Sequence, residues 1–179
     1  MFRMAPFLFW PVAALAQTQA APFTMADSIA SMEAGVICAP EAVGEIAAPD
    51  TIAGSTHTID ISPPFVSTGA VVPAVIGVGF GVKAMSAALE GIDNVTVVVT
   101  HPPMGPDGTT RQSYQTAIGG VSSSLTFYQF DYAYELQTGA WQIDAVKDEV
   151  LLFSARFTVV PPQQVPELAG VCGFLDLLS

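Results

Sequence analysis

Residues 94–118 read NVTVVVTHPPMGPDGTTRQSYQTAI, and this stretch decides the fold. Two β-rich segments, 94–101 and 109–118, flank a short segment of prolines, glycines and an aspartate. Proline fixes φ and glycine permits left-handed backbone, so this composition favours a turn. The stretch therefore predicts two successive strands joined by a stiff turn.

The same alternation of short β-rich segments and turn signals extends along the chain. We expect strands at residues 29–38, 53–61, 73–83, 94–101, 109–118, 123–131, 139–147 and 150–160. Many short strands with closely spaced turn signals are typical of an all-β sandwich or barrel. The sequence predicts an all-β, immunoglobulin-like antiparallel β-sandwich of about seven to nine strands.

Residues 134–143, YELQTGAWQI, support the sandwich. In immunoglobulin-like folds a corner of this kind leads into the penultimate core strand and anchors an aromatic side chain. Trp141 would fill the core between the sheets, and its indole N–H would then need an acceptor. Asp148 and Glu149 are expected to turn the chain into the last strand.

Residues 1–16, MFRMAPFLFWPVAALA, have the features of a secretory signal peptide. Arg3 precedes an apolar stretch that ends in an A-x-A cleavage site, and the stretch is too short to span a bilayer. We expect residues 17–28 to be a loose leader and residues 29–179 a single β-sandwich domain with a C-terminal tail. The mature protein would be periplasmic or secreted, without a membrane span.

The charge balance argues against nucleic acid as a partner. The chain has 5 Lys and Arg against 16 Asp and Glu, a net charge of −11. Phosphate binding needs clustered Lys and Arg, which this chain lacks. The expected partner is an unidentified protein or small molecule of the periplasm.

The two cysteines, Cys38 and Cys172, predict a disulfide, because an even count in an exported chain favours pairing. Closing so long a loop would contribute on the order of 4–5 kcal/mol in the chain-entropy model. The alternative is two buried free thiols. No CxxC motif indicates a redox or zinc site.

Gly77, Gly79 and Gly81 alternate with apolar residues and would share one face of a strand. Three glycines on one face indicate close approach of another group. That group is either an aromatic side chain of a neighbouring strand, Phe127 or Tyr128, or a ligand or partner strand lying in a flat groove.

Catalytic motifs are missing, so no catalytic residue is predicted. No G-x-S-x-G motif occurs, and the two histidines, His57 and His101, have the setting of ordinary structural residues. The acids Asp131, Glu135 and Asp144 could meet at one end of the sandwich and act as a carboxylate-based hydrolase. Whether the protein is an enzyme stays open, with a non-enzymatic role favoured.

Residues 101–114 hold the candidate binding residues. His101 and Met104 place a nitrogen and a thioether in one loop, a combination suited to copper, although packing roles explain both. His101, Arg111 and Tyr114 could form a recognition patch for an acidic or aromatic partner. The alternative is that Arg111 pairs with an acid on a neighbouring strand and braces the loop. No cofactor is predicted.

Several short motifs together resemble one known family. They are Gly35–Cys38, Pro49–Thr51 with Gly54, Val72–Ala74, Gly79–Lys83, His101–Pro106, Thr110–Tyr114, Glu135–Trp141 and Phe157–Pro161. The chain is similar, over residues 29–179, to a bacterial exported family known as domain of unknown function 3859. Tyr114 stands where the family pattern leads us to expect tryptophan. The resemblance implies a periplasmic or secreted bacterial protein and supplies no catalytic residues.

The function that these observations favour is an exported, non-enzymatic binding or protein-interaction module. The alternatives are a carboxylate-based hydrolase and a periplasmic copper-binding protein that uses His101 and Met104. The sequence specifies neither the ligand nor the oligomeric state.

Overall fold

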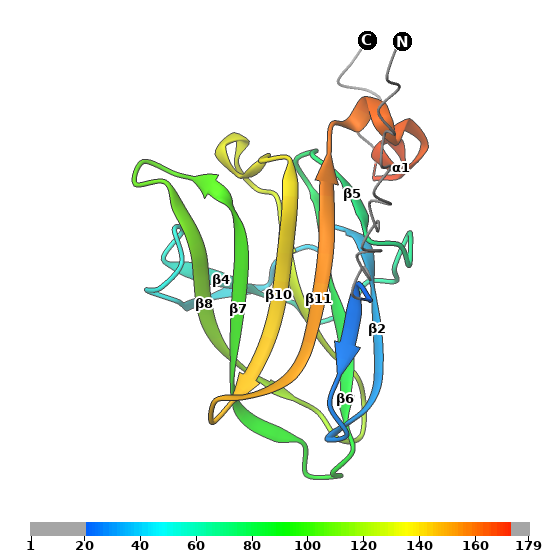
Figure 1. Ribbon diagram of the computed structural model, residues 1–179, viewed down its shortest axis with the longest axis vertical. Helices are drawn as coiled ribbons and strands as arrows, with labels where there is room; N and C mark the ends of the chain where they lie inside the picture. Colours follow the sequence, from blue (N-terminus) through cyan, green and yellow to red (C-terminus); the bar gives the residue numbers. More distant parts are fainter. Residues whose placement is uncertain (1–20, 173–179) are drawn as a thin grey trace, which may run out of the picture.

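The computed structural model describes residues 21–172, which form two packed sheets and a separate hairpin (Figure 1). The larger sheet has the order β1-β11-β10-β7-β8, and β5 also pairs with β11. Its strands are β1 Phe23–Met25, β5 Val71–Pro73, β7 Ile92–Met104, β8 Thr109–Ile118, β10 Gly139–Lys147 and β11 Val150–Val160. All its pairings are antiparallel except the one between β5 and β11.

The smaller sheet has the order β2-β6-β9 and is antiparallel. Its strands are β2 Ile29–Cys38, β6 Val78–Ser86 and β9 Ser124–Gln129. A two-stranded hairpin of β3 Gly44–Ala47 and β4 Ser55–Thr58 lies outside both sheets. Helical structure in the described residues is limited to the 3-10 turns η1 Ala133–Glu135 and η2 Pro162–Gln164 and to α1 Pro166–Val171.

The predicted all-β sandwich is confirmed, with eleven strands between residues 21 and 172 rather than seven to nine. Four of the predicted strands, 29–38, 109–118, 139–147 and 150–160, coincide with β2, β8, β10 and β11. The additional strands are short edge strands, β1, β3 and β5, whose few residues carry little periodic signal. β1 lies in the segment expected to be a loose leader, where it pairs with residues 153–155 of β11.

The segment 101–104 continues β7 instead of forming the turn. The register passes from Thr100 opposite Arg111 to Met104 opposite Thr109, so β7 carries a bulge that accommodates Pro102 and Pro103. The turn itself is confined to residues 105–108.

Aromatic side chains fill the core between the two sheets. Phe80 from the smaller sheet packs against Trp141 and Phe157 from the larger one, with ring centroids 5.6 and 4.9 Å away. Trp141 is fully buried, and its indole N–H donates to the carbonyl oxygen of Gln137 at 2.9 Å. The predicted corner, with an aromatic on the penultimate strand and an acceptor in the preceding loop, is therefore present.

The predicted last hairpin is also confirmed. Asp148 and Glu149 connect β10 to β11, and both have positive φ, 48° and 67°. A two-residue connection with positive φ at both positions matches the twist of the flanking strands.

The glycine strip is packed against its own sheet rather than open to a ligand. A Cβ at Gly81 would collide with the carbonyl oxygen of Thr126 and lie 2.7 Å from Cα of Phe127. A Cβ at Gly79 would lie 3.0 Å from the carbonyl oxygen of Tyr128. The group that approaches is thus the backbone of β9, and Gly77 lies before β6 begins.

The predicted disulfide is present: Cys38 at the end of β2 is bonded to Cys172 directly after α1, with the Cα atoms 5.2 Å apart. It ties the short C-terminal helix to the smaller sheet. The expected signal peptide, residues 1–16, lies outside the described residues. Between residues 21 and 172, no helix has the length and apolar character needed to cross a membrane.

Candidate functional site

The β3–β4 hairpin is attached to the edge of the larger sheet. The backbone N–H of Ser113 on β8 donates to the carbonyl oxygen of Asp50 at 3.2 Å. The N–H of Ile52 donates to Oε1 of Gln112 on the same strand at 2.7 Å. These bonds fix the hairpin beside β8, where Figure 1 shows β4 lying.

A cavity of about 470 Å³ lies under this hairpin, and we call it the hairpin pocket. Its walls come from the hairpin, from β8 and β9, and from the loop that follows β9. The lining residues are Glu45, Ile46, Thr51, Ala53, residues 55–59, Val99, Gln112, residues 114–116, Leu125, residues 127–129, Asp131, Tyr132 and Glu135. This volume is in the range of small-molecule sites, roughly 300–1,000 Å³.

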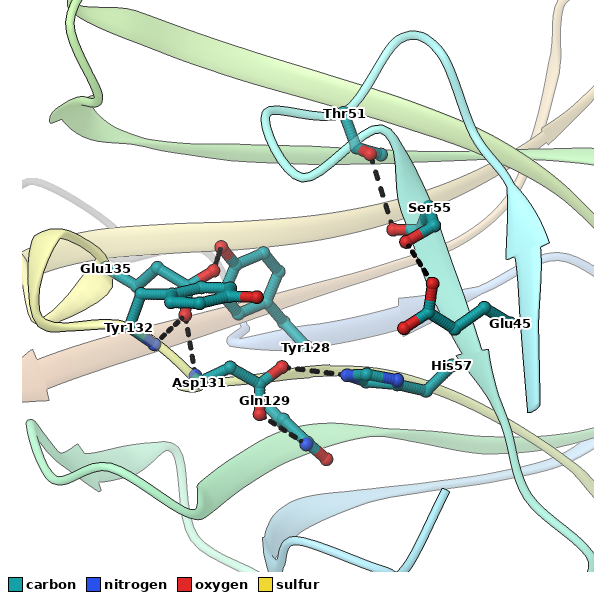
Figure 2. A network of polar contacts seen from close by, with 9 residues as sticks. All are labelled: Glu45, Thr51, Ser55, His57, Tyr128, Gln129, Asp131, Tyr132 and Glu135. Atoms are coloured by element: carbon teal, nitrogen blue, oxygen red, sulfur yellow. Dashed lines mark hydrogen bonds and ion pairs between the residues drawn. The ribbon is translucent and has the colours of Figure 1, made fainter. Parts of the chain in front are cut away.

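His57 and Asp131 connect the hairpin to the smaller sheet across the pocket. Nε2 of His57 on β4 lies 3.0 Å from Oδ2 of Asp131, which follows β9 (Figure 2). Gln129 donates from Nε2 to the other oxygen of Asp131 at 2.6 Å. The carboxylate is thereby held between two side chains from different elements.

Glu135 is a buried carboxylate at the inner end of the same loop. It accepts the hydroxyl of Tyr128 at 2.7 Å and the backbone N–H groups of Asp131 and Tyr132 at 2.6 and 2.8 Å (Figure 2). These bonds shape the 3-10 turn η1 and fix Asp131. Burial raises the pKa of Glu135 above its usual range. Burial is the main cause that raises the pKa of Tyr128, and the nearby Glu135 carboxylate raises it further.

On the hairpin side, the Ser55 hydroxyl donates to Oε2 of Glu45 at 3.1 Å (Figure 2). Ser55 and His57 are two residues apart on β4, so both side chains point to the same face. The Ser55 hydroxyl is thus engaged with Glu45 rather than with the imidazole, which contacts Asp131.

His101 and Met104 lie in the core. His101 is 4% exposed, and its ring packs on Trp141 at a centroid distance of 4.9 Å. Gln112 lies 3.1 Å from Nε2 of His101, and Nδ1 lies 2.8 Å from the carbonyl oxygen of Pro102. Because the carbonyl can only accept, Nδ1–H donates to it and Nε2 accepts from the Gln112 amide. Neither ring nitrogen is left for a metal ion.

A stability change with pH follows from the burial of His101. Burial lowers the pKa of His101 below its ordinary value of 6.5. The unfolded chain therefore binds this proton more readily, so the free energy of unfolding falls as pH drops below about 6.5. We expect His101→Gln to reduce this slope between pH 7.5 and 5.5, measured by urea unfolding. Equal slopes in the two proteins would contradict the prediction.

The predicted patch of His101, Arg111 and Tyr114 is not assembled. Arg111 is exposed, and Tyr114 lies three residues later on β8, so their side chains point to opposite faces of the sheet. Tyr114 lines the hairpin pocket, and burial raises its pKa. Among the described residues, Arg111 takes part in no ion pair. The alternative, in which Arg111 pairs with an acid on a neighbouring strand and braces the loop, therefore has no acid to support it.

The three predicted acids are also divided. Asp131 and Glu135 are neighbours in the loop after β9, joined by the bond from the Asp131 N–H. Asp144 lies on β10, where its carboxylate accepts from Gln142 at 2.8 Å, and it does not line the pocket. In the described part of the chain, no three His, Cys, Asp or Glu side chains form a metal-binding group.

His57 and Glu45 line the hairpin pocket, and neither was predicted as a site residue. The sequence signal that could have identified His57 is the alternation along the strand, which places Ser55 and His57 on one face. Their partners lie far away in sequence: Asp131 follows His57 by 74 residues. Only the docking of the hairpin beside β8 and β9 brings these groups together.

Two sheets packed face to face, with a buried tryptophan on the penultimate strand, define an immunoglobulin-like β-sandwich. A solved immunoglobulin-like protein from Pseudomonas aeruginosa has this fold. It is 18% identical to this chain, with a TM-score of 0.51, and the match covers 98% of that protein and 78% of this chain. The model of the family named domain of unknown function 3859 matches residues 25–159, and the chain belongs to this family. The resemblance inferred from the sequence motifs is thus confirmed.

A second solved structure is similar over a smaller part of the chain. It is the alkylpurine DNA glycosylase AlkC of Pseudomonas fluorescens bound to DNA, with 14% identity and a TM-score of 0.31. The likeness covers 51% of this chain and 28% of the glycosylase. No curated protein matches the chain.

Proposed function

We propose that this protein is an exported binding module that takes a small ligand in the hairpin pocket. The observation that carries the proposal is the pocket itself: a cavity of about 470 Å³ between two sheet edges and a hairpin, into which polar side chains converge. Immunoglobulin-like sandwiches offer rigid strands, and groups placed on rigid elements are held in a fixed arrangement.

Polar groups of the pocket are hydrogen-bonded to one another, which favours binding over catalysis. The hydrolase alternative needs two convergent acids; Asp144 is on the other sheet, so of the three predicted acids only Asp131 and Glu135 come together. Glu135 uses both carboxylate oxygens to hold Tyr128 and the η1 backbone. These groups serve to position the pocket rather than to transfer protons.

Export is supported by two observations from different parts of the chain. Residues 1–16 have the composition of a signal peptide. The Cys38–Cys172 bond is of the kind that persists in oxidising compartments. Both fit a periplasmic or secreted protein.

The proposal is tested with a variant that fills the pocket. Ala53 is exposed and lines the cavity, so Ala53→Trp adds an indole at its mouth with little disturbance of the fold. Val121→Trp is the matched control, because Val121 is 83% exposed and lies outside the lining. A thermal-shift screen of small polar metabolites should give compounds that stabilise the wild type and Val121→Trp but not Ala53→Trp.

Two results would count against the proposal. One is a screen in which no compound stabilises the wild-type protein. The other is stabilisation that persists in Ala53→Trp, because the ligand would then bind elsewhere on the molecule. Native mass spectrometry of the freshly purified protein extends the screen to ligands that co-purify.

A further inference from the structure

A chain of three hydrogen bonds connects the core of the sandwich to the β3–β4 hairpin. Nδ1 of His101 lies 2.8 Å from the carbonyl oxygen of Pro102, and Nε2 lies 3.1 Å from the side-chain nitrogen of Gln112. The side-chain oxygen of Gln112 accepts the backbone N–H of Ile52, which lies between β3 and β4, at 2.7 Å. The chain of bonds therefore begins at a buried imidazole and ends at the hairpin.

The direction of each bond in this chain follows from which atoms can donate. The N–H of Ile52 can only donate, so the Gln112 amide presents its oxygen to the hairpin and its NH2 group to His101. Because that NH2 group also can only donate, Nε2 of the imidazole accepts and Nδ1–H donates to Pro102. The chain of bonds is therefore complete only while His101 is neutral.

The hairpin is attached to the rest of the molecule by few hydrogen bonds. In the part of the chain that the structure describes, three of them join residues 44–58 to other elements: Ser113 to Asp50, Ile52 to Gln112 and His57 with Asp131. Neither β3 nor β4 pairs with a strand of the two sheets. The Gln112 side chain thus supplies one of the two hydrogen bonds that hold the hairpin to β8.

We propose that His101 is a pH sensor that controls how firmly the hairpin is attached to β8. A proton added to Nε2 turns this atom into a donor, and it then faces the NH2 group of Gln112, which is also a donor. Rotating the amide by half a turn presents its oxygen to the imidazolium, and a hydrogen bond from a charged donor is a strong one. The rotated amide then directs its NH2 group at the N–H of Ile52, so the bond to the hairpin is lost.

The groups packed around His101 leave the imidazole as the group that titrates within this chain of bonds. It packs on Trp141 of β10 and contacts Gln112 of β8, and neither side chain titrates. From the smaller sheet, Tyr128 faces the Gln112 amide, and its hydroxyl donates to Glu135. Burial lowers the pKa of His101 below 6.5 and raises the pKa of Glu135, so the experiment must separate these two groups.

The histidine on the hairpin itself does not give the same response. Because a carboxylate accepts, Nε2–H of His57 already donates to Asp131. Protonation of His57 then takes place at Nδ1, and the contact with Asp131 stays in place between opposite charges. Acid therefore weakens the attachment of the hairpin through His101 and not through His57.

The hairpin forms one wall of the hairpin pocket. Loosening it opens this pocket at acid pH, a consequence that rests on the proposed function. The change at Gln112 and Ile52 takes place in the ligand-free protein, where it is tested without any ligand.

Amide hydrogen exchange of the ligand-free protein, followed by NMR from about pH 7.5 to about pH 5, tests the inference across the ordinary histidine pKa of about 6.5. After correction for the intrinsic exchange rate at each pH, the protection of the Ile52 and Ser113 amides should fall about three- to tenfold, the effect of one lost hydrogen bond. The ring resonances of His101 report its protonation in the same samples. The Phe130 amide, which bonds to Val78 in the smaller sheet, is the internal control and should keep its protection.

Two matched variants identify the titrating group. The chain has two histidines, so His101→Gln and His57→Gln each remove one imidazole. We expect His101→Gln to abolish the pH dependence of Ile52 protection and His57→Gln to retain it. If His101→Gln fails to fold, Gln112→Leu replaces it. Leucine cannot accept the Ile52 N–H, so the protection should be low and equal at both ends of the pH range.

Three results would overturn the inference. Constant protection of Ile52 while His101 titrates shows that the hairpin is not released. A pH dependence that persists in His101→Gln, or disappears in His57→Gln, assigns the response to Glu135 or to the contact of His57 with Asp131. An equal loss at Phe130 shows acid unfolding of the whole domain. The binding module is tested separately, by the ligand screen, and stands or fails independently of these results.

Discussion

Replacing Trp141 by alanine is expected to lower the free energy of unfolding by about 3–5 kcal/mol, the range for large aromatic truncations in a core. Trp141 is 1% exposed and packs against Phe80, Tyr128 and Phe130, with centroid distances of 5.0 to 5.7 Å. Removing the indole leaves a cavity in contact with both sheets. It also leaves the Gln137 carbonyl without its donor.

The measurement is urea or guanidinium unfolding followed by circular dichroism and Phe and Tyr fluorescence. Trp141→Phe is the matched control, because it keeps an aromatic ring and loses only the N–H and part of the volume. We expect its loss to be less than half of that for Trp141→Ala. A loss below about 1 kcal/mol for Trp141→Ala would show that the indole is not a core residue.

The second large effect concerns the disulfide. The double variant Cys38→Ser/Cys172→Ser is expected to lose about 2–5 kcal/mol of unfolding free energy, because the cross-link restricts a long loop in the unfolded chain. The bonded residues are 134 positions apart. In α1 only Ala169 is buried, so the helix has little apolar contact of its own to hold it in place.

Two measurements check this prediction. Chemical unfolding should show the loss in the double variant and in the reduced wild type but not in the oxidised wild type. Hydrogen exchange should show residues 162–172 losing protection at lower denaturant than the strands. Equal midpoints with and without reductant would contradict the stabilising role of the bond.

The sequence alone predicted much of the larger sheet. β8, β10 and β11 were predicted because each combines β-branched residues with strong turn signals at both ends, such as 105–108 and 148–149. The Trp141 corner and the cysteine pairing were predicted for similar local reasons. The short edge strands were missed because three or four residues, such as β3, carry too little periodicity.

The sequence predicted less of the candidate site. Alternation along β8 places Arg111 and Tyr114 on opposite faces of the sheet, so this local rule excludes the predicted patch. The contact of His101 with Gln112 joins two strands, and it depends on the register of β7 with β8, in which Val99 lies opposite Gln112. The pairing of His57 with Asp131 had no local signal.

Turn composition, strand periodicity and the presence of two cysteines determined the fold class, because these are properties of neighbouring residues. Tertiary structure decided the hairpin pocket, since its groups come from β4, β8, β9 and the η1 loop. The hairpin is placed by two bonds to β8, from Ser113 to Asp50 and from Ile52 to Gln112. Contacts between residues so far apart depend on how the sheets pack, and the sequence pattern of any single segment does not contain them.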